Sequence, residues 1–196
     1  MRVITGSARG RKLHAPKGLD TRPTSDMVKG AMMNIVQFEL EGANVLDLFA
    51  GSGQLGIEAL SRGARCCVFV DNRRDCDTAI RDNLEHTGLR DKSRIYLTDV
   101  SVWLRGAPGP FDIAFLDPPY QQNLLEKSLP SVAGLMRESG AILCEASRDE
   151  LFPETAGGFP LIKVYYYGKT KVALYRKPDS DDLPAKLPRD DFDGGI

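Results

Sequence analysis

Two short segments carry the residue types that could do chemistry. The sequence DLFAGSG occupies positions 47–53, and DPPY occupies positions 117–120. Each overlaps or follows a short apolar run, VLDL or IAFL, that is typical of a buried parallel strand. Ligands of open α/β sheets bind beyond the carboxyl ends of the strands. We therefore expect both segments to face the same cleft.

The first segment has the spacing of a ligand-binding glycine loop. Gly51, Gly53 and Gly56 satisfy G-x-G-x-x-G, and glycines let the backbone turn tightly and approach a ligand closely. Asp71 lies 20 residues after Gly51, at the end of the next predicted strand. A carboxylate there can accept hydrogen bonds from both hydroxyls of a ribose. By itself this pattern fits either a dinucleotide or S-adenosylmethionine.

Asp47 separates these two ligands. It stands four residues before the first glycine, at the predicted strand end. A carboxylate there would repel a pyrophosphate, whereas it attracts the ammonium of S-adenosylmethionine, whose sulfonium adds more positive charge. Asp99, which follows the predicted third strand, is placed to accept from an adenine amine. The residues therefore favour the methyl donor over NAD.

The DPPY segment is suited to hold a planar amine. Its prolines remove two backbone N–H donors and fix φ, so the turn is rigid and presents acceptors. Tyr120 offers a flat face on which a base can stack. An exocyclic amine is a poor nucleophile because its lone pair is delocalised into the ring. Hydrogen bonds accepted by Asp117 and the Pro118 carbonyl would help the nitrogen attack a sulfonium methyl in line, with neither a metal nor a nucleophilic side chain.

The intervening sequence alternates between strand and helix patterns. This alternation predicts a parallel sheet with right-handed crossovers and helices on both faces. Expected helices are 25–36, capped by Thr24 or Ser25, 54–61, 73–86, and 124–136 divided at Pro130; expected strands are 44–48, 66–70, 94–97, 112–116, 141–144, and a closing hairpin of 161–167 and 171–176.

Composition excludes several other classes of protein. The 196 residues, 42% of them hydrophobic, suffice for one domain with a sizeable core. No apolar run has the length of a membrane helix, and the charged N-terminus is unlike a signal peptide. The four cysteines and two histidines lack the spacing of a zinc site. We expect a cytoplasmic protein with reduced thiols and no metal.

Charge is distributed unevenly along the chain. Residues 1–30 carry seven basic side chains against two acidic ones, although the formal net charge of the chain is −1. This basic head indicates contact with a polyanion. Residues 178–196 hold six aspartates and three prolines and are expected to form a disordered tail.

Together these motifs resemble the bacterial 16S ribosomal RNA guanine-N2 methyltransferase family, the RsmD type. The resemblance covers roughly residues 1–177. It is carried by DLFAGSG and DPPY together with RVITG at 2–6, RGRKL at 9–13, TRPTSD at 21–26, LSRGA at 60–64 and YGKT at 167–170. Gln54 departs from the pattern, since a small residue is commoner there, and the acidic tail lies outside it.

The resemblance implies an α/β fold with a class I methyltransferase, Rossmann-like sheet of seven strands, mostly parallel with one antiparallel strand. With the acidic tail at 178–196 set apart by its composition, we expect a basic N-terminal β-hairpin extension at 1–20 and a methyltransferase domain at 21–177. The implied cofactor is S-adenosyl-L-methionine, and the implied partner is 16S ribosomal RNA or an assembly intermediate of the small subunit, with no membrane.

The resemblance also implies roles for individual residues. The cofactor set is Asp47, Phe49, Ala50, Gly51, Ser52 and Gly53 for the methionine portion, Asp71 for the ribose and Asp99 for the adenine, with Asn72 and Val100 as further cofactor-binding residues. The catalytic set is Asp117, Pro118, Pro119 and Tyr120, which hold the target guanine. The substrate set is Arg9, Arg11 and Lys12 for RNA phosphates, and Arg22 and Thr24 near the catalytic mouth.

Three alternatives remain open. Adenine-N6 methyltransferases use a similar tetrapeptide, usually with Asn first, but generally need a separate target-recognition domain, for which this chain lacks room. A catalytically silent RNA-binding relative would not need Asp47, Asp71 and DPPY. An NAD-dependent oxidoreductase would need a proton relay near the nicotinamide, and neither His14 nor His86 is well placed.

Overall fold

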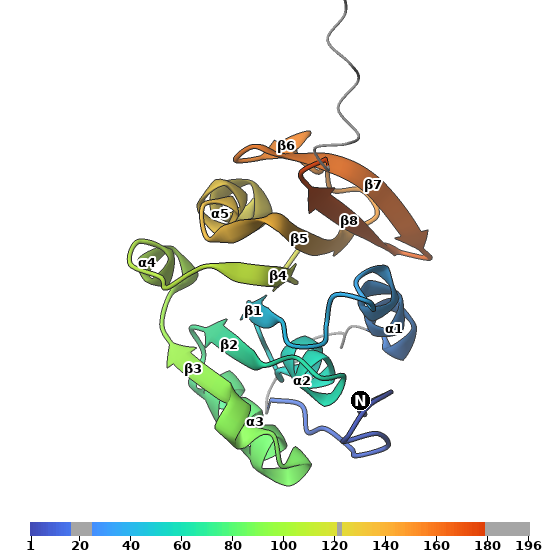
Figure 1. The fold of residues 1–196 in the computed structure, drawn as a ribbon, viewed down its shortest axis with the longest axis vertical. Coiled ribbons are helices and arrows are strands. Elements are labelled where there is room, and N and C mark those ends of the chain that lie inside the picture. The colour runs from blue at the N-terminus through green and yellow to red at the C-terminus, as the bar shows by residue number, and fades with distance from the viewer. Residues whose placement is uncertain (17–24, 121–122, 179–196) are drawn as a thin grey trace, which may run out of the picture.

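An eight-stranded sheet forms the middle layer of the molecule, with the order β3-β2-β1-β4-β5-β8-β7-β6 (Figure 1). The computed structural model describes residues 1–16, 25–120 and 123–178. Strands β3, β2, β1, β4 and β5 are parallel, whereas β8 runs antiparallel to both β5 and β7. The strands are β1 (Asn44–Leu48), β2 (Cys66–Asp71), β3 (Ser93–Leu97), β4 (Phe111–Leu116), β5 (Met136–Ser147), β6 (Thr155–Ala156), β7 (Phe159–Tyr167) and β8 (Thr170–Arg176).

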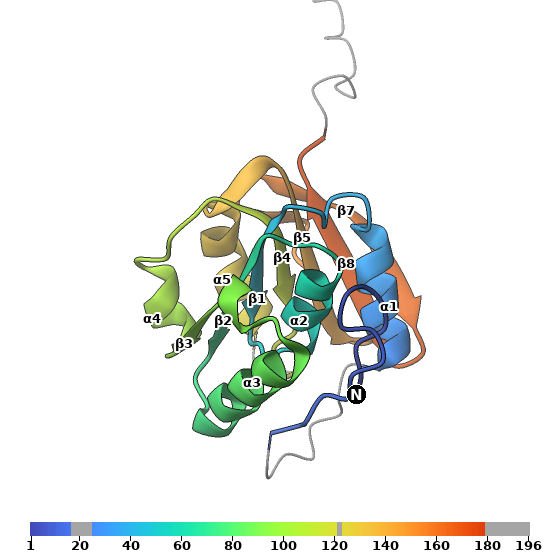
Figure 2. The ribbon, with the colours of Figure 1, turned by 60° about the horizontal axis from the view of Figure 1, so that its bottom comes forward.

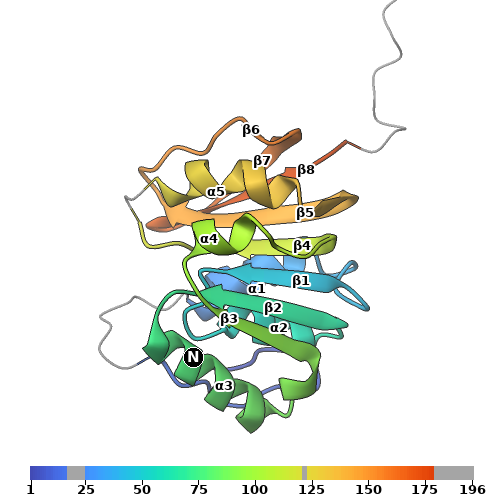
Figure 3. The ribbon, with the colours of Figure 1, turned by 90° about the vertical axis from the view of Figure 1, so that its left-hand side faces the viewer.

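Helices cover both faces of the sheet, as the alternating pattern predicts. Figure 2 shows α1, α2 and α3 on one face, and Figure 3 shows α4 and α5 on the other, with the strands stacked from β7 and β8 down to β3. The helices are α1 (Asp26–Ile35), α2 (Gln54–Ser61), α3 (Arg74–Thr87), the 3-10 turn η1 (Arg90–Lys92), α4 (Val100–Leu104) and α5 (Leu124–Ala133). None of the helices among the described residues is long and apolar enough to cross a membrane.

Alternate side chains of each central strand fill two separate cores. In β2, Cys67 and Phe69 pack toward α1–α3, whereas Val68 and Val70 pack toward α4 and α5. Burial on both faces explains why the central strands read as continuous apolar runs. Cys67, Cys76 and Cys144 are buried free thiols, as expected, and Cys66 is half-buried.

The structure confirms Ser25 as the cap of α1 and shows how α3 ends. The Ser25 hydroxyl accepts a hydrogen bond from the Val28 N–H at 3.2 Å and caps α1. Gly88 ends α3 in the left-handed conformation, with φ of 72°. Thr24, the alternative cap, lies outside the described residues.

Several elements differ from the expected ones. β5 begins at Met136, which was expected in the preceding helix, and not at Ala141. Pro130 lies inside α5 and does not divide it, because the apolar face that includes Leu129 and Val132 keeps the helix packed on the sheet; the helix ends three residues later. The five-residue α4 was not expected, since it is too short to show a helical repeat. The eighth strand, β6, has two residues that pair with β7, which is too few for an alternating pattern.

The N-terminal segment, residues 1–16, packs against α2 and α3 (Figure 2). It folds back on itself as a tight antiparallel turn with a single bridge between Arg2 and Lys12. Val3, Ala8 and Leu13 are buried in the core on the α1–α3 side. The acidic tail predicted at 178–196 lies outside the described residues apart from Pro178.

Candidate active site

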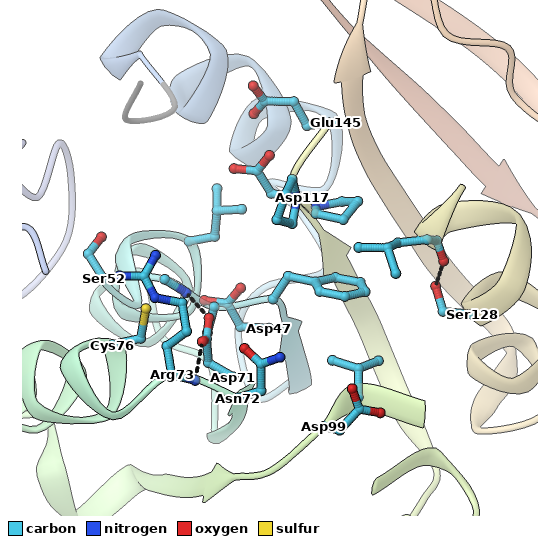
Figure 4. A pocket seen from close by; sticks show the side chains of 18 of the residues that line it. Asp47, Ser52, Asp71, Asn72, Arg73, Cys76, Asp99, Asp117, Ser128 and Glu145 are labelled. Carbon is cyan, nitrogen blue, oxygen red and sulfur yellow. Dashed lines mark hydrogen bonds between the residues drawn. The ribbon is translucent and has the colours of Figure 1, made fainter. Parts of the chain in front are cut away.

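A pocket of about 870 Å³ opens at the carboxyl edge of the parallel strands (Figure 4). It brings together the segments that follow β1, β2, β3 and β4. The expected site residues that line it are Asp47, Phe49, Ala50, Gly51, Ser52, Asp71, Asn72, Asp99, Val100, Asp117, Pro118, Pro119 and Tyr120. Gly53 is the one member of the expected cofactor and catalytic sets that does not line the pocket.

The glycine loop depends on left-handed backbone at three positions. Phe49, Gly51 and Gly53 have φ values of 64°, 56° and 75°. Gly53 begins α2, and a Cβ there would lie 3.3 Å from the Phe69 ring, so this residue faces the core. A Cβ on Gly56 would lie 2.3 Å from the same ring. The third glycine therefore permits close packing of α2 on β2 and does not approach a ligand.

Asp47 serves the helix as well as the pocket. It is 1% exposed, and its Oδ2 accepts a hydrogen bond from the Gly56 N–H at 2.8 Å, which satisfies a first-turn donor of α2. Burial raises the pKa of Asp47 well above its ordinary value, and the charges of Asp117 and Asp71 act in the same direction, against the Gly56 hydrogen bond. A cation entering the pocket would relieve this repulsion and favour the ionised carboxylate.

Asp71 and Asp99 both hold backbone turns around the pocket. Asp71 accepts from the Gly51 N–H at 2.9 Å and from the Arg73 N–H at 3.0 Å, so it fixes the glycine loop against the end of β2. Asp99 caps α4 by accepting from the Ser101 N–H at 2.8 Å. The hydroxyl of Ser101 also bonds to Asp99 and holds the pKa of that carboxyl below its usual range.

The DPPY turn follows β4 and places Tyr120 beside β5 and β8. Pro118 is buried, whereas Asp117 is half-buried at the pocket wall. The Tyr120 hydroxyl donates to Oε1 of Glu145 at 3.1 Å and lies 3.5 Å from the Thr170 hydroxyl. Burial, together with the charges of Glu145 and Asp117, raises the pKa of Tyr120 to about 12. The ring is therefore anchored by a neutral hydroxyl.

Several pocket residues were not predicted from the sequence. Glu145 is 4% exposed and lines the pocket from β5. A signal for it exists, because an acidic residue interrupts the apolar run AILCEA near a strand end. Arg105 and Lys127 also line the pocket but look like ordinary surface cations in the sequence. Met1, Ala15 and Pro16 line it from the N-terminal segment.

Carboxylates outnumber cations around the pocket. Five acidic residues of the described chain line it, against three basic residues. One of the three, Arg73, forms an ion pair with Asp75. The acidic residues are Asp47, Asp71, Asp99, Asp117 and Glu145; the basic residues are Arg73, Arg105 and Lys127. This balance favours a cationic ligand and disfavours a pyrophosphate.

The expected RNA-contact residues lie apart from this pocket. Arg9, Arg11 and Lys12 are exposed on the N-terminal segment, and none of them lines the pocket. Arg11 donates to the His86 carbonyl at 2.6 Å. Arg22 and Thr24 lie outside the described residues. Within the part of the chain that the structure describes, no group of three or more His, Cys, Asp or Glu side chains could hold a metal ion.

The sheet order, with antiparallel β8 inserted between β5 and β7, and the glycine loop at the carboxyl edge define a class I, Rossmann-like methyltransferase fold. The chain belongs to the family described as "Conserved hypothetical protein 95", whose family model matches residues 1–176. The protein family expected from the motifs is thereby confirmed.

Individual relatives agree with this assignment over most of the chain. Ribosomal RNA small subunit methyltransferase D of Escherichia coli (strain K12) is 30% identical over 179 residues, which cover 90% of each protein. YlbH of Bacillus subtilis (strain 168) is 40% identical over 182 residues, which cover 90% of this chain and 99% of the relative. The solved structure of yhhF from Escherichia coli has a TM-score of 0.80 and 31% identity, covering 90% of this chain and 97% of that one.

Proposed function

We propose that this protein is an S-adenosylmethionine-dependent methyltransferase that modifies small-subunit ribosomal RNA. The observation that carries the proposal is the convergence of the glycine loop and the DPPY turn on one acidic pocket. The relatives named ribosomal RNA small subunit methyltransferase D support the substrate class. At a finer level, we propose that the methyl acceptor is the exocyclic N2 of a guanine in 16S ribosomal RNA. The activity would be that of a 16S ribosomal RNA (guanine 966-N2)-methyltransferase.

The acidic residues that line the pocket fit S-adenosylmethionine. Asp47, which is buried and near two other carboxylates, would hold the ammonium, and Asp71 would accept from the ribose hydroxyls. Asp99 and Val100 would border the adenine. When bound, the cofactor supplies an electrophilic methyl group on its sulfonium.

The residues of the chain then position the base and take up charge. Tyr120, whose hydroxyl is tied to Glu145 and lies near Thr170, presents its ring to the guanine. Asp117 and the Pro118 carbonyl accept one hydrogen bond each from the two N–H groups of the amine, so that the nitrogen lone pair points at the methyl carbon. During methyl transfer to the amine, Asp117 would stabilise the positive charge that develops on the nitrogen. The nitrogen would then lose one proton, which Asp117 would accept.

Labelled methyl transfer tests this function. Purified protein is incubated with labelled S-adenosylmethionine and either naked 16S ribosomal RNA or small-subunit particles, and the RNA is digested to nucleosides. We expect N2-methylguanosine as the labelled product. N6-methyladenosine would instead support the adenine-specific alternative, and absence of transfer to both substrates would refute the proposal.

The basic residues of the N-terminal segment provide a prediction for RNA binding. Substitution of Arg9, Arg11 and Lys12 by alanine should weaken RNA binding and flatten its salt dependence. The variant would neutralise fewer phosphates, so its binding would release fewer counterions. The slope of log K against log salt should fall in magnitude by about 2 for three lost contacts. Filter binding or fluorescence anisotropy between about 50 and 200 mM salt measures this slope.

A matched variant controls for the loss of three positive charges. Arg65, Lys92 and Arg94 are also exposed, near the starts of β2 and β3, and none of them belongs to the N-terminal segment. Their joint substitution by alanine should leave the slope within about 0.5 of the wild-type value. An unchanged slope in the N-terminal variant, or an equal change in the control, would show that the segment is not the RNA contact.

A further inference from the structure

Asn83 joins the glycine loop to the N-terminal segment. It lies on α3, is 0% exposed and does not line the pocket. Its side-chain amide Nδ2 donates to the Ser52 carbonyl at 2.9 Å and to the His14 carbonyl at 3.0 Å, while Oδ1 accepts from the His14 N–H at 2.8 Å. A single buried side chain therefore fixes the backbone of two segments that are 38 residues apart in the sequence.

Both of these segments form walls of the pocket. Ser52 lines it within the glycine loop, and Ala15 and Pro16, which follow His14 directly, line it from the other segment. The Ser52 hydroxyl also lies 3.6 Å from the Met1 sulfur, in hydrogen-bond geometry. Both segments that the Asn83 side chain holds therefore contribute residues to the pocket wall.

Other contacts hold the N-terminal segment without touching the glycine loop. The Glu58 carboxylate on α2 accepts from the Ile4 N–H at 2.7 Å and the Thr5 N–H at 3.0 Å. The Ser61 hydroxyl accepts from the Ala8 N–H at 3.0 Å and donates to the Thr5 carbonyl at 2.6 Å. These bonds attach the first half of the segment to α2. Asn83 differs from them because its bonds also reach the pocket.

We propose that Asn83 is a positioning residue that couples cofactor binding to the conformation of the N-terminal segment. A ligand that orders the glycine loop also orders Ser52, and Asn83 transmits this order to His14 and to the basic residues preceding it. By reciprocity, RNA held by Arg9, Arg11 and Lys12 would strengthen cofactor binding. The inference rests on the proposed function, because it assigns the pocket to S-adenosylmethionine and the segment to RNA.

Substitution of Asn83 by alanine tests the coupling. The dissociation constant of S-adenosylhomocysteine is measured by calorimetry, and hydrogen exchange of peptides within residues 1–16 is followed with and without that ligand. We expect the wild-type segment to exchange more slowly when the ligand is bound. In Asn83→Ala, the dissociation constant should rise about tenfold, and the ligand should no longer change exchange in the segment.

Two control variants separate coupling from loss of stability. Thr87 is buried one turn further along α3, and its hydroxyl donates only to helix carbonyls, those of Asn83 and Leu84. Ser61→Ala loosens the segment at α2 without touching the glycine loop. We expect Thr87→Val and Ser61→Ala to bind the ligand within about twofold of wild type and to retain its effect on exchange.

The outcomes distinguish this inference from the proposed function. Absence of ligand binding by the wild-type protein would refute the proposed function. Wild-type binding together with an Asn83→Ala variant that behaves like Thr87→Val would refute the coupling alone. If Asn83→Ala does not fold, Asn83→Asp replaces it, because aspartate keeps the size and the acceptor for the His14 N–H but loses both donors. An unchanged Asn83→Asp variant would equally overturn the inference.

Discussion

Replacement of Asp117 by alanine is expected to lower kcat for methyl transfer by about 10³-fold while changing the dissociation constant of S-adenosylmethionine less than about threefold. Asp117 directly follows β4 and lines the pocket wall, next to the rigid prolines. In the proposed mechanism, its carboxylate meets the amine of the base and the positive charge that develops there. An effect confined to kcat identifies an interaction that is made mainly in the transition state.

Asp117→Asn provides the matched control for this experiment. It keeps the size of the side chain and one carbonyl acceptor but loses the negative charge. We expect an intermediate loss of kcat, smaller than that of alanine. Single-turnover transfer and calorimetry on the same preparations separate chemistry from binding. Full activity in Asp117→Ala would remove the mechanism, and a large loss of cofactor binding would reassign Asp117 to the cofactor.

The second large effect is expected at Asp47, where asparagine should weaken S-adenosylmethionine binding about 10- to 100-fold. The reason is the loss of a charge-assisted hydrogen bond to the ammonium inside a buried site. An asparagine oxygen can still accept the hydrogen bond that the Gly56 N–H donates to Asp47. Cofactor affinity should therefore fall without disruption of α2.

The raised pKa of Asp47 determines how the free energy of unfolding and the cofactor affinity change with pH. Because burial raises the pKa of Asp47, the native protein holds this proton above pH 3.8, where an ordinary aspartate would lose it. Stability is thus fully present below that ordinary pKa and decreases as pH rises toward the raised pKa. Asp47→Asn should consequently not lower the free energy of unfolding at pH 7. The affinity of wild type for the cationic cofactor should rise with pH over the same window, whereas that of Asp47→Asn should not.

Asp112→Asn is a suitable comparison for Asp47→Asn. Asp112 also accepts a backbone hydrogen bond, from the Asn44 N–H at 2.8 Å, but lies near the start of β4, away from the pocket. The same charge change there should leave cofactor affinity within about twofold. If Asp47→Asn binds S-adenosylmethionine as tightly as Asp112→Asn does, Asp47 does not recognise the ammonium.

The sheet and the segments around the pocket could be predicted because their signals are local. A strand buried on both faces needs a continuous apolar run, and loops at the carboxyl ends of neighbouring parallel strands must meet. These two facts are enough to place Asp47, Asp71 and Asp117 at one edge of the sheet from the sequence alone. They do not decide which residues of a loop reach the pocket. The roles of Gly53 and Gly56 in backbone geometry and packing were therefore visible only in the structure.

The remaining features depend on contacts between distant parts of the chain. Asn83 sits in an ordinary amphipathic helix, and its importance arises only when α3 packs beside both Ser52 and His14. Glu145 has a local signal, but its hydrogen bond with Tyr120 requires β5 and β4 to be neighbours. The pairing of β6 with β7 likewise depends on tertiary packing, because two residues carry no periodic pattern.

A crystal structure with S-adenosylhomocysteine bound would show whether the glycine loop and the DPPY turn form one active site. We expect the amino group of the ligand beside Asp47, its ribose at Asp71 and its sulfur facing the turn from Asp117 to Tyr120. That turn should remain open to solvent, so that a base can enter. A ligand seated elsewhere, or a turn closed off from both ligand and solvent, would rule out this active site.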